Sequence, residues 1–231
     1  MRKRGTMGLC LAMFIGGGGF LAATAQAPAQ DRSTHGAAVG DPEAGKSIAE
    51  TKCVICHGAD GNSADPKTPK LASQNPAYLY WQLWAFKRGT RKSDVMSGIV
   101  AALSDSDMAN TASFYSRQNI QSDPVQDPRL AAIGERIFSA GVGPGMMSSC
   151  AMCHGSGRPG GMSGMMGRMS MMGGGMMSHV PNLNSQHAAY IIDQLNRFAD
   201  GEREGSVMNG IAAALSETDK RAVAEFLSGL R

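Results

Sequence analysis

The chain has 231 residues, of which 42% are hydrophobic, and a formal net charge of +3 at pH 7. Three of its 22 basic residues are Arg2, Lys3 and Arg4, and none of its 19 acidic residues lies in the first 25 positions. Beyond residue 25 the chain carries 19 residues of each sign, so its charge gives no support for a nucleic-acid-binding function.

Residues 1–25 are predicted to be a cleaved signal peptide. The basic start is followed by an apolar, glycine-rich stretch, and Ala23-Thr24-Ala25 forms a small-x-small cleavage site. An uncleaved membrane anchor is the alternative, although the four glycines at residues 16–19 weaken the stretch as a spanning helix. Residues 26–40 are expected to be a flexible segment. No later apolar run is long enough to cross a bilayer, so the mature protein should be exported and soluble.

Two motifs, CVICH at Cys53–His57 and CAMCH at Cys150–His154, carry most of the chemical information. Each is a Cys-x-x-Cys-His, the attachment pattern of a c-type haem. Cysteines three apart on one helical turn present both sulfurs on one side, where they can add to the two vinyl groups of one porphyrin. The next residue, His57 or His154, is then the proximal ligand of the iron. The sequence predicts two haem c groups per chain, linked through Cys53, Cys56, Cys150 and Cys153.

A zinc site and disulfide chemistry are the alternatives. Two Cys-x-x-Cys pairs can bind zinc, but such pairs usually lie closer in sequence than Cys56 and Cys150 do. An exported protein could also use each pair as a disulfide or a redox-active dithiol. Neither alternative explains a histidine directly after both pairs.

Helices are expected around each motif. In the first part of the chain they are predicted at Gly45 to Lys52, at Pro76 to Lys87, and from Ser104-x-x-Asp107, which resembles a capping box. The corresponding segments of the second part are Gly134 to Ala140, His187 to Ala199, and the stretch that starts at Ser216-x-x-Asp219. Their apolar residues, Trp81 and Trp84 included, are most simply interpreted as packing against the core or a haem.

These two parts are copies of one unit. A shift of 112 positions aligns Leu71–Phe114 with Leu183–Phe226 without a gap. Matched pairs include Ser73/Ser185, Tyr78/Tyr190, Gln82/Gln194, Phe86/Phe198, Arg91/Arg203, Met96/Met208 and Asp107/Asp219. Residues 120–130, a polar stretch with two prolines, are predicted to link the copies.

Met96 and Met208 are the candidate sixth ligands. Each lies far downstream of its haem histidine, at the same position of the repeat, and is expected in a loop between helices. A lone methionine is usually core filler, but its recurrence at a matched position favours axial ligation.

In duplicate, the pattern Cys-x-x-Cys-His-Gly, Pro-x-Leu, Tyr-x-x-x-Gln-Leu-x-x-Phe, Gly-x-Arg, Met-x-Gly-Ile and Leu-Ser-x-x-Asp resembles the dihaem cytochrome c4 family. The resemblance covers nearly all of residues 41–231. It implies an all-α protein of two tandem class I cytochrome c domains, at residues 41–119 and 131–231.

The resemblance also implies axial pairs of His57 with Met96 and His154 with Met208. Pro69 and Pro181 match the proline whose carbonyl accepts the hydrogen bond of the proximal histidine; an ordinary turn proline is the alternative. The implied function is electron relay in the bacterial periplasm between redox proteins, such as an upstream dehydrogenase or quinol-oxidising complex and a terminal oxidase, without enzymatic activity.

The second copy contains a methionine- and glycine-rich insertion at residues 158–178. The distance from Cys150 to Leu183 is 33 positions, against 18 from Cys53 to Leu71. Thioethers favour Cu(I), and His179 could complete such a site. An adaptable surface loop without bound metal is the alternative. The extra methionines could also compete with Met208 as ligand.

The segments before the two methionines differ in charge. Residues 87–92 read KRGTRK, whereas residues 200–204 read DGERE. We expect these opposite charges either to hold the two copies face to face or to orient docking of a partner; solvated charge of little weight is the alternative.

A dihaem peroxidase is the enzymatic alternative. It would need a spare histidine in place of a methionine, and the candidates are His35, His179 and His187. His187 aligns with Asn75, which indicates local variation and favours the electron carrier.

Overall fold

A computed structural model of the chain describes residues 40–142, 149–155 and 179–230, which belong to one compact unit. The predicted signal peptide, nearly all of the segment 26–40 and the Met-rich insertion lie outside these residues. The described part contains helices and connecting segments and no β-strand.

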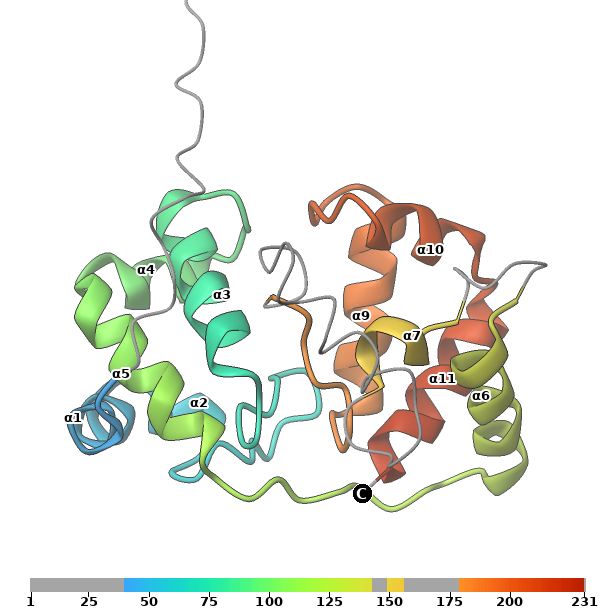
Figure 1. Cartoon of the computed structure of the whole chain (residues 1–231), viewed down its shortest axis with the longest axis horizontal. Helices are drawn as coiled ribbons and strands as arrows, with labels where there is room; N and C mark the ends of the chain where they lie inside the picture. Colours follow the sequence, from blue (N-terminus) through green and yellow to red (C-terminus); the bar gives the residue numbers. More distant parts are fainter. Residues whose placement is uncertain (1–39, 143–148, 156–178, 231) are drawn as a thin grey trace, which may run out of the picture. The chain divides into compact units, whose positions relative to one another are not determined.

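The helices form two sets that follow the sequence repeat (Figure 1). The first half of the molecule contains α1 (Pro42–Ile48), a π-helical turn η1 (Ala49–Cys53), α2 (Val54–His57), α3 (Pro76–Arg88), α4 (Asp94–Ala101) and α5 (Asp105–Ser116). The second half contains α6 (Pro128–Ala140), α7 (Ala151–His154), α9 (Ala188–Ala199), α10 (Met208–Ala214) and α11 (Glu217–Gly229).

The first helix of each half begins earlier than the sequence predicts. Asp41 caps α1 by accepting a hydrogen bond from Glu43 N, and Asp127 caps α6 by accepting from Arg129 N and Leu130 N. A proline occupies the first helical position in both, where its fixed φ suits the helix and its missing N–H costs nothing. The helix α6 therefore starts inside the predicted linker.

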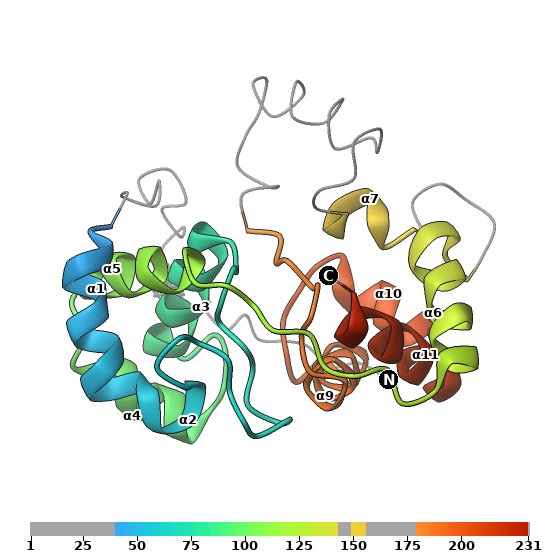
Figure 2. The same cartoon turned by 90° about the horizontal axis from the view of Figure 1, so that it is seen from below.

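Helix packing is the same in both halves. In the first half α1 packs on α5, and α3 packs on α4 and α5; in the second half α6 packs on α11, and α9 packs on α10 and α11. Figure 2 shows α1 beside α5 and α6 beside α11. A Cβ at Gly45 would lie 2.0 Å from Asn110 O, and one at Gly134 would lie 1.9 Å from Ala222 O. Glycine at these positions allows each pair of helices to approach closely.

Each half has its own hydrophobic core. The first is centred on Val100, Met108 and Tyr115, which are fully buried, and Cys53 and Met96 pack against it. The second is formed by Ile137, Phe138, Ile191, Leu195, Ala212, Leu215, Ala222, Val223, Ala224 and Leu227, and Cys150 and Met208 pack against it. The two cores thus repeat the arrangement that the sequence repeat predicts.

The predicted capping boxes of the last helices are present. Ser104 and Asp107 exchange hydrogen bonds at the start of α5, and Ser216 and Asp219 do so at the start of α11. Both boxes satisfy backbone N–H groups that the first helical turn leaves without partners.

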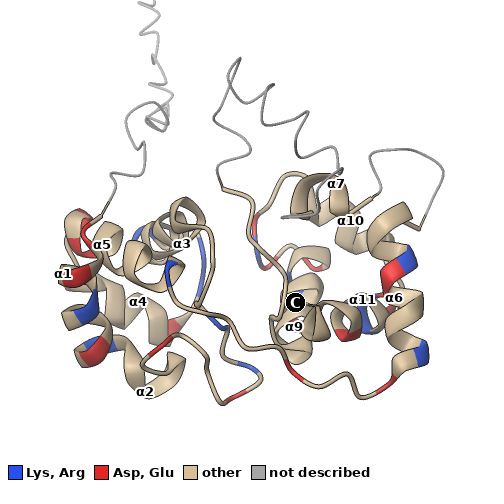
Figure 3. Cartoon of the chain, turned by 60° about the horizontal axis from the view of Figure 1, so that its bottom comes forward, with Lys and Arg blue, Asp and Glu red and all other residues tan. Residues whose placement is uncertain are grey.

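Charged residues of both signs are interspersed on the outer helices α1 and α6 (Figure 3). No helix of the described residues is long and apolar enough to cross a membrane.

Candidate haem-binding site

The first Cys-x-x-Cys-His motif lies at the junction of η1 and α2. Cys53 ends the π-helical turn, and its thiol is half-buried, whereas Cys56 is exposed and His57 is buried. Single π-helical turns are rare and occur often at functional sites. In the second motif Cys150 precedes α7, Cys153 is exposed, and His154 is half-buried at the end of the helix. Both motifs therefore form one short helical turn, as the spacing of the cysteines requires.

Each histidine is held by a proline carbonyl. His57 Nδ1 lies 2.9 Å from Pro69 O, and His154 Nδ1 lies 3.0 Å from Pro181 O. A carbonyl can only accept, so Nδ1 carries the proton and Nε2 keeps its lone pair. The predicted contact of Pro69 and Pro181 with the two histidines is confirmed.

Burial keeps both imidazoles neutral. Burial lowers the pKa of His57 and of His154, and the hydrogen bonds to Pro69 and Pro181 oppose this change only in part. A neutral imidazole with a fixed tautomer is the form that binds a metal ion. The two histidines are therefore prepared for ligation through Nε2.

No disulfide joins Cys53, Cys56, Cys150 or Cys153 in the described part of the chain. Burial raises the pKa of Cys53 and of Cys150, so these two are protonated near neutral pH. A redox-active dithiol would instead have a lowered pKa. Within the described residues no three His, Cys, Asp or Glu side chains gather as a metal site. The zinc and dithiol alternatives gain no support from this geometry.

The methionines are not in loops, as the sequence analysis expects, but in helices. Met96 lies in the first turn of α4, whose cap Ser93 accepts a hydrogen bond from Met96 N, and Met208 is the first residue of α10. The Ser93-Asp94 pair is a helix-start signal that the sequence analysis missed. Both methionines pack against the same core cluster as the first cysteine of their own motif.

A residue network joins the two halves, and it is made of matched residues. Arg91 donates to Tyr190 Oη (2.9 Å) and Gln194 Oε1 (2.8 Å) of the second half. Its counterpart Arg203 donates to Tyr78 Oη (2.9 Å) and Gln82 Oε1 (3.1 Å) of the first half. Each arginine also donates to the glutamine of its own half, at 2.5 Å. The two halves thus contact each other through matched residues, in an approximately twofold arrangement.

One carboxylate borders the network, since Asp193 accepts from Gln194 Nε2 at 2.7 Å. Neither Arg91 nor Arg203 forms an ion pair with a carboxylate of the described chain. Burial alone would raise the pKa of Tyr78, but Arg203 and Arg91 outweigh burial and lower it.

The opposite charges of the two loops are not paired with each other in the described part of the chain. Over the described residues no ion pair connects residues 87–92 with residues 200–204, and Glu202 pairs instead with Arg197 of its own half at 3.7 Å. The matched arginines take this role because their guanidinium groups reach the tyrosine and glutamine of the opposite helix. No ion pair supports the face-to-face version of the charge hypothesis, which stays a prediction.

The linker crosses the contact and is tied to both halves. Asp123 accepts from Lys70 Nζ at 2.6 Å and lies 2.7 Å from His187 Nδ1. Lys70 also donates to Gln121 O at 2.6 Å, and His187 Nε2 lies 2.9 Å from Ser63 O. Lys70 and Asp123 were not predicted as functional residues, and His187 was named only as a spare histidine of the peroxidase alternative. Only the mismatch of His187 with Asn75 in the repeat was a signal, and the sequence analysis interpreted it as local variation.

The remaining candidates of the peroxidase alternative are engaged elsewhere. His187 is held by Asp123 and Ser63, and the ring of His179 lies tilted against Trp81 with ring centroids 4.9 Å apart. Trp81 also stacks on Trp84, at 4.7 Å. His35 lies outside the described residues.

Comparison with known proteins identifies the family. The family model described as Cytochrome c matches residues 42–122. A protein described as cytochrome c4 from Pseudomonas aeruginosa is 37% identical over 197 residues, which cover 84% of this chain and 90% of that protein. A protein described as a thiosulfate dehydrogenase electron acceptor from Thiomonas intermedia is 32% identical, over 76% of this chain and 77% of that protein.

A solved structure supports the same assignment. Reduced recombinant cytochrome c4 from Pseudomonas stutzeri matches this chain with a TM-score of 0.70 and 35% identity, over 83% of this chain and 100% of that one. The predicted all-α fold of two tandem class I cytochrome c domains is confirmed. Two covalently bound haem c groups and electron transfer without enzymatic activity follow from the family. This chain belongs to the cytochrome c4 family of dihaem electron carriers.

Proposed function

We propose that each half holds one haem c through the residues of its own motif and its own methionine. The thioether links would be made by Cys53 and Cys56 in the first half and by Cys150 and Cys153 in the second. The axial pairs would be His57 with Met96 and His154 with Met208. Each haem supplies one-electron redox chemistry at its iron when bound.

The observation that carries this proposal is the fixed tautomer of the two histidines. Their Nδ1 atoms are occupied by the carbonyls of Pro69 and Pro181, so Nε2 is the atom left for a metal. Two cysteines precede each histidine on the same helical turn, and the methionine packs on the same core. The described residues therefore fit the group that the family implies.

We further propose that the protein works in the periplasm, exported by the segment 1–25. There it would accept electrons from an upstream dehydrogenase or quinol-oxidising complex and pass them to a terminal acceptor such as an oxidase. The relative described as a thiosulfate dehydrogenase electron acceptor supports the dehydrogenase as donor. Weak, transient docking is the mode that such relay requires.

Replacement of the methionines tests the ligand assignment. Met96→Leu and Met208→Leu should each remove about half of the methionine-to-iron charge-transfer band of the oxidised protein, because each haem loses its sixth ligand. Met108→Leu is the matched control, since Met108 is a fully buried core methionine with no proposed ligand role. A full band in the Met208→Leu variant would show that another methionine, such as one from the insertion, binds the second iron.

Copper binding by the Met-rich insertion remains a prediction from sequence. The insertion lies outside the described residues, and the ring of His179, which follows it, lies tilted against Trp81. Calorimetric titration with Cu(I) before and after deletion of residues 160–177 checks it. Equal heats from both proteins would exclude a copper site in the insertion.

A further inference from the structure

The contact between the halves includes two glutamines that hold backbone groups of the opposite half. Gln186 Oε1 accepts from Lys70 N at 2.9 Å, and Gln186 Nε2 donates to Lys70 O at 2.9 Å. Its counterpart Gln74 accepts from Asn182 N and donates to Asn182 O, both at 2.7 Å. Lys70 and Asn182 are themselves matched by the 112-residue shift. Each glutamine thus pairs with one backbone residue across the contact, at equivalent places.

The two residues held in this way directly follow Pro69 and Pro181. The N–H of Asn182 and the C=O of Pro181 belong to one peptide group, and so do the N–H of Lys70 and the C=O of Pro69. A continuous path runs from His154 Nδ1 to Pro181 O (3.0 Å), through the peptide, and from Asn182 N to Gln74 Oε1 (2.7 Å). The equivalent path joins His57 to Gln186, with distances of 2.9 Å at both steps.

The backbone before each glutamine is fixed in an uncommon conformation. Ser73 and Ser185 are the non-glycine residues of the described chain with positive φ, 55° and 58°. Ser73 N donates to Tyr115 O at 3.1 Å, and Ser185 N donates to Leu227 O at 2.8 Å. Such a conformation persists where its surroundings determine it, and it is found often at functional sites. Here it directs the next residue, Gln74 or Gln186, towards the other half.

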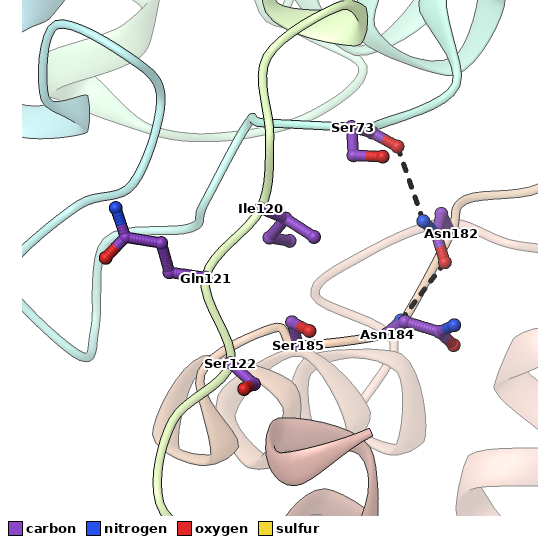
Figure 4. Close-up of a pocket in the computed structure, with 7 residues that line it drawn as sticks. All are labelled: Ser73, Ile120, Gln121, Ser122, Asn182, Asn184 and Ser185. Atoms are coloured by element: carbon purple, nitrogen blue, oxygen red, sulfur yellow. Dashed lines mark hydrogen bonds between the residues drawn. The ribbon is translucent and has the colours of Figure 1, made fainter. Parts of the chain in front are cut away.

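Both glutamines are buried and well held. Gln74 is 7% exposed and Gln186 is 5% exposed. Asn182 Nδ2 also donates to Ser73 O at 3.3 Å, a contact drawn in Figure 4. This hydrogen bond lies beside a hollow of about 540 Å³, which is lined in part by Ser73, Asn182 and Ser185. The glutamine side chains therefore hold a fixed geometry.

We propose that Gln74 and Gln186 are positioning residues that act on the haem of the opposite half. This proposal rests on the proposed ligands His57 and His154, and it adds a link between the two haems. A hydrogen bond accepted from the N–H of a peptide increases the negative charge on its carbonyl oxygen, because bonds in a chain polarise one another. The carbonyl then accepts more strongly from Nδ1 and makes the histidine a better donor to iron. A better donor stabilises the oxidised state and lowers the reduction potential.

The proposed effect is crossed, because each glutamine acts on the haem of the opposite half. Substitution by methionine, which is similar in length and lacks the amide, tests it. Gln74→Met should raise the potential of the haem bound to His154, and Gln186→Met should raise that of the haem bound to His57. We expect about a twofold change in the oxidised-to-reduced ratio at fixed potential, since the effect is a cooperative one on a single bond. A potentiometric titration, monitored through the NMR signals of the two axial methionines, assigns each reduction potential to its haem.

Gln82→Met is the matched control. Gln82 also lies in the contact and loses hydrogen bonds to Arg91 and Arg203, but it holds no peptide next to a haem proline. The Gln82→Met variant should not raise the reduction potential of the opposite half's haem selectively. A shift confined to the haem of the substituted half, or equal shifts of both haems, would overturn the proposal.

The contact can also be checked without any substitution. In the fully reduced wild-type protein, a coupling across the hydrogen bond should join the amide nitrogen of Asn182 to the side-chain carbonyl carbon of Gln74. Absence of this coupling and of its Lys70–Gln186 counterpart overturns the proposal even if the variants do not fold. Loss of the methionine-to-iron band in the wild-type protein would instead contradict the proposed ligands, so the two failures are distinguishable.

Discussion

In the first half Lys70 occupies the position that Asn182 holds in the second half, and Asn75 the position that His187 holds. The backbone of Lys70 and Asn182 is held in the same way by the opposite glutamine, but their side chains differ. The Lys70 ammonium group is buried against the linker and pairs with Asp123, which also reaches His187. The comparison shows that the repeat alone builds a nearly twofold contact, and that the linker makes it asymmetric.

The largest effect should come from breaking this asymmetric element. Asp123→Ala removes the acidic partner of the Lys70 ammonium group, whose side chain is only 3% exposed. An unpaired buried charge is strongly destabilising, so the free energy of unfolding should fall by about 3 kcal/mol. Guanidinium denaturation of the dihaem protein measures it. The control is Glu50→Ala, which removes an exposed pair with Lys46 and should cost at most about 0.5 kcal/mol. Equal losses would contradict the role assigned to the linker.

Acid should remove the same stabilisation. Burial alone would raise the pKa of Asp123, but hydrogen bonds from Lys70 and His187 outweigh it and hold the pKa below its ordinary value of 3.8. A lowered folded-state pKa stabilises the protein above the unfolded-state value, and this contribution is lost as the pH falls through the folded-state value. The difference in stability between wild type and Asp123→Ala should therefore narrow as the pH falls below 3.8. A difference that stays constant to lower pH would exclude ionised Asp123 as its source.

A smaller effect is expected where the halves are alike. Gly45→Ala places a methyl group 2.0 Å from Asn110 O, and Gly134→Ala places one 1.9 Å from Ala222 O. Forcing the helices apart should lower the free energy of unfolding by about 2 kcal/mol in either half. Thermal or chemical denaturation compares the two variants. Ser47→Ala, on the exposed face of α1, is the control and should change it by less than about 0.5 kcal/mol. An effect of Gly45→Ala no larger than this control would contradict the close approach of α1 and α5.

The smallest effect should come from the matched capping boxes. Ser104→Ala and Ser216→Ala each remove a hydroxyl that accepts from the N–H of an aspartate three residues on, at 3.0 and 3.2 Å. Each should lower the free energy of unfolding by about 1 kcal/mol, a typical value for loss of a cap. Near-equal losses in denaturation experiments would support the equivalence of α5 and α11. A loss in one half alone would show that the two helices are stabilised differently.

Local patterns in the sequence predict much of the fold. The Cys-x-x-Cys-His motifs, the capping boxes at Ser104 and Ser216, and the apolar spacing of the central helices depend on residues close together in the chain. The 112-residue shift aligns Met96 with Met208 and identifies the duplicated unit. The Asp41-Pro42 and Asp127-Pro128 pairs were equally local helix-start signals, and they were missed.

The sequence by itself indicates which residues each half is expected to use, because haem attachment and helix capping need fixed local spacing. Only the tertiary structure decided what joins the halves. The opposite charges of residues 87–92 and 200–204 were the visible candidates, yet the contacts come from one arginine of each segment, Arg91 and Arg203, and from two glutamines that reach the opposite half. Such contacts join residues about a hundred positions apart, and their geometry depends on packing and on the turns at Ser73 and Ser185. No local pattern specifies that geometry.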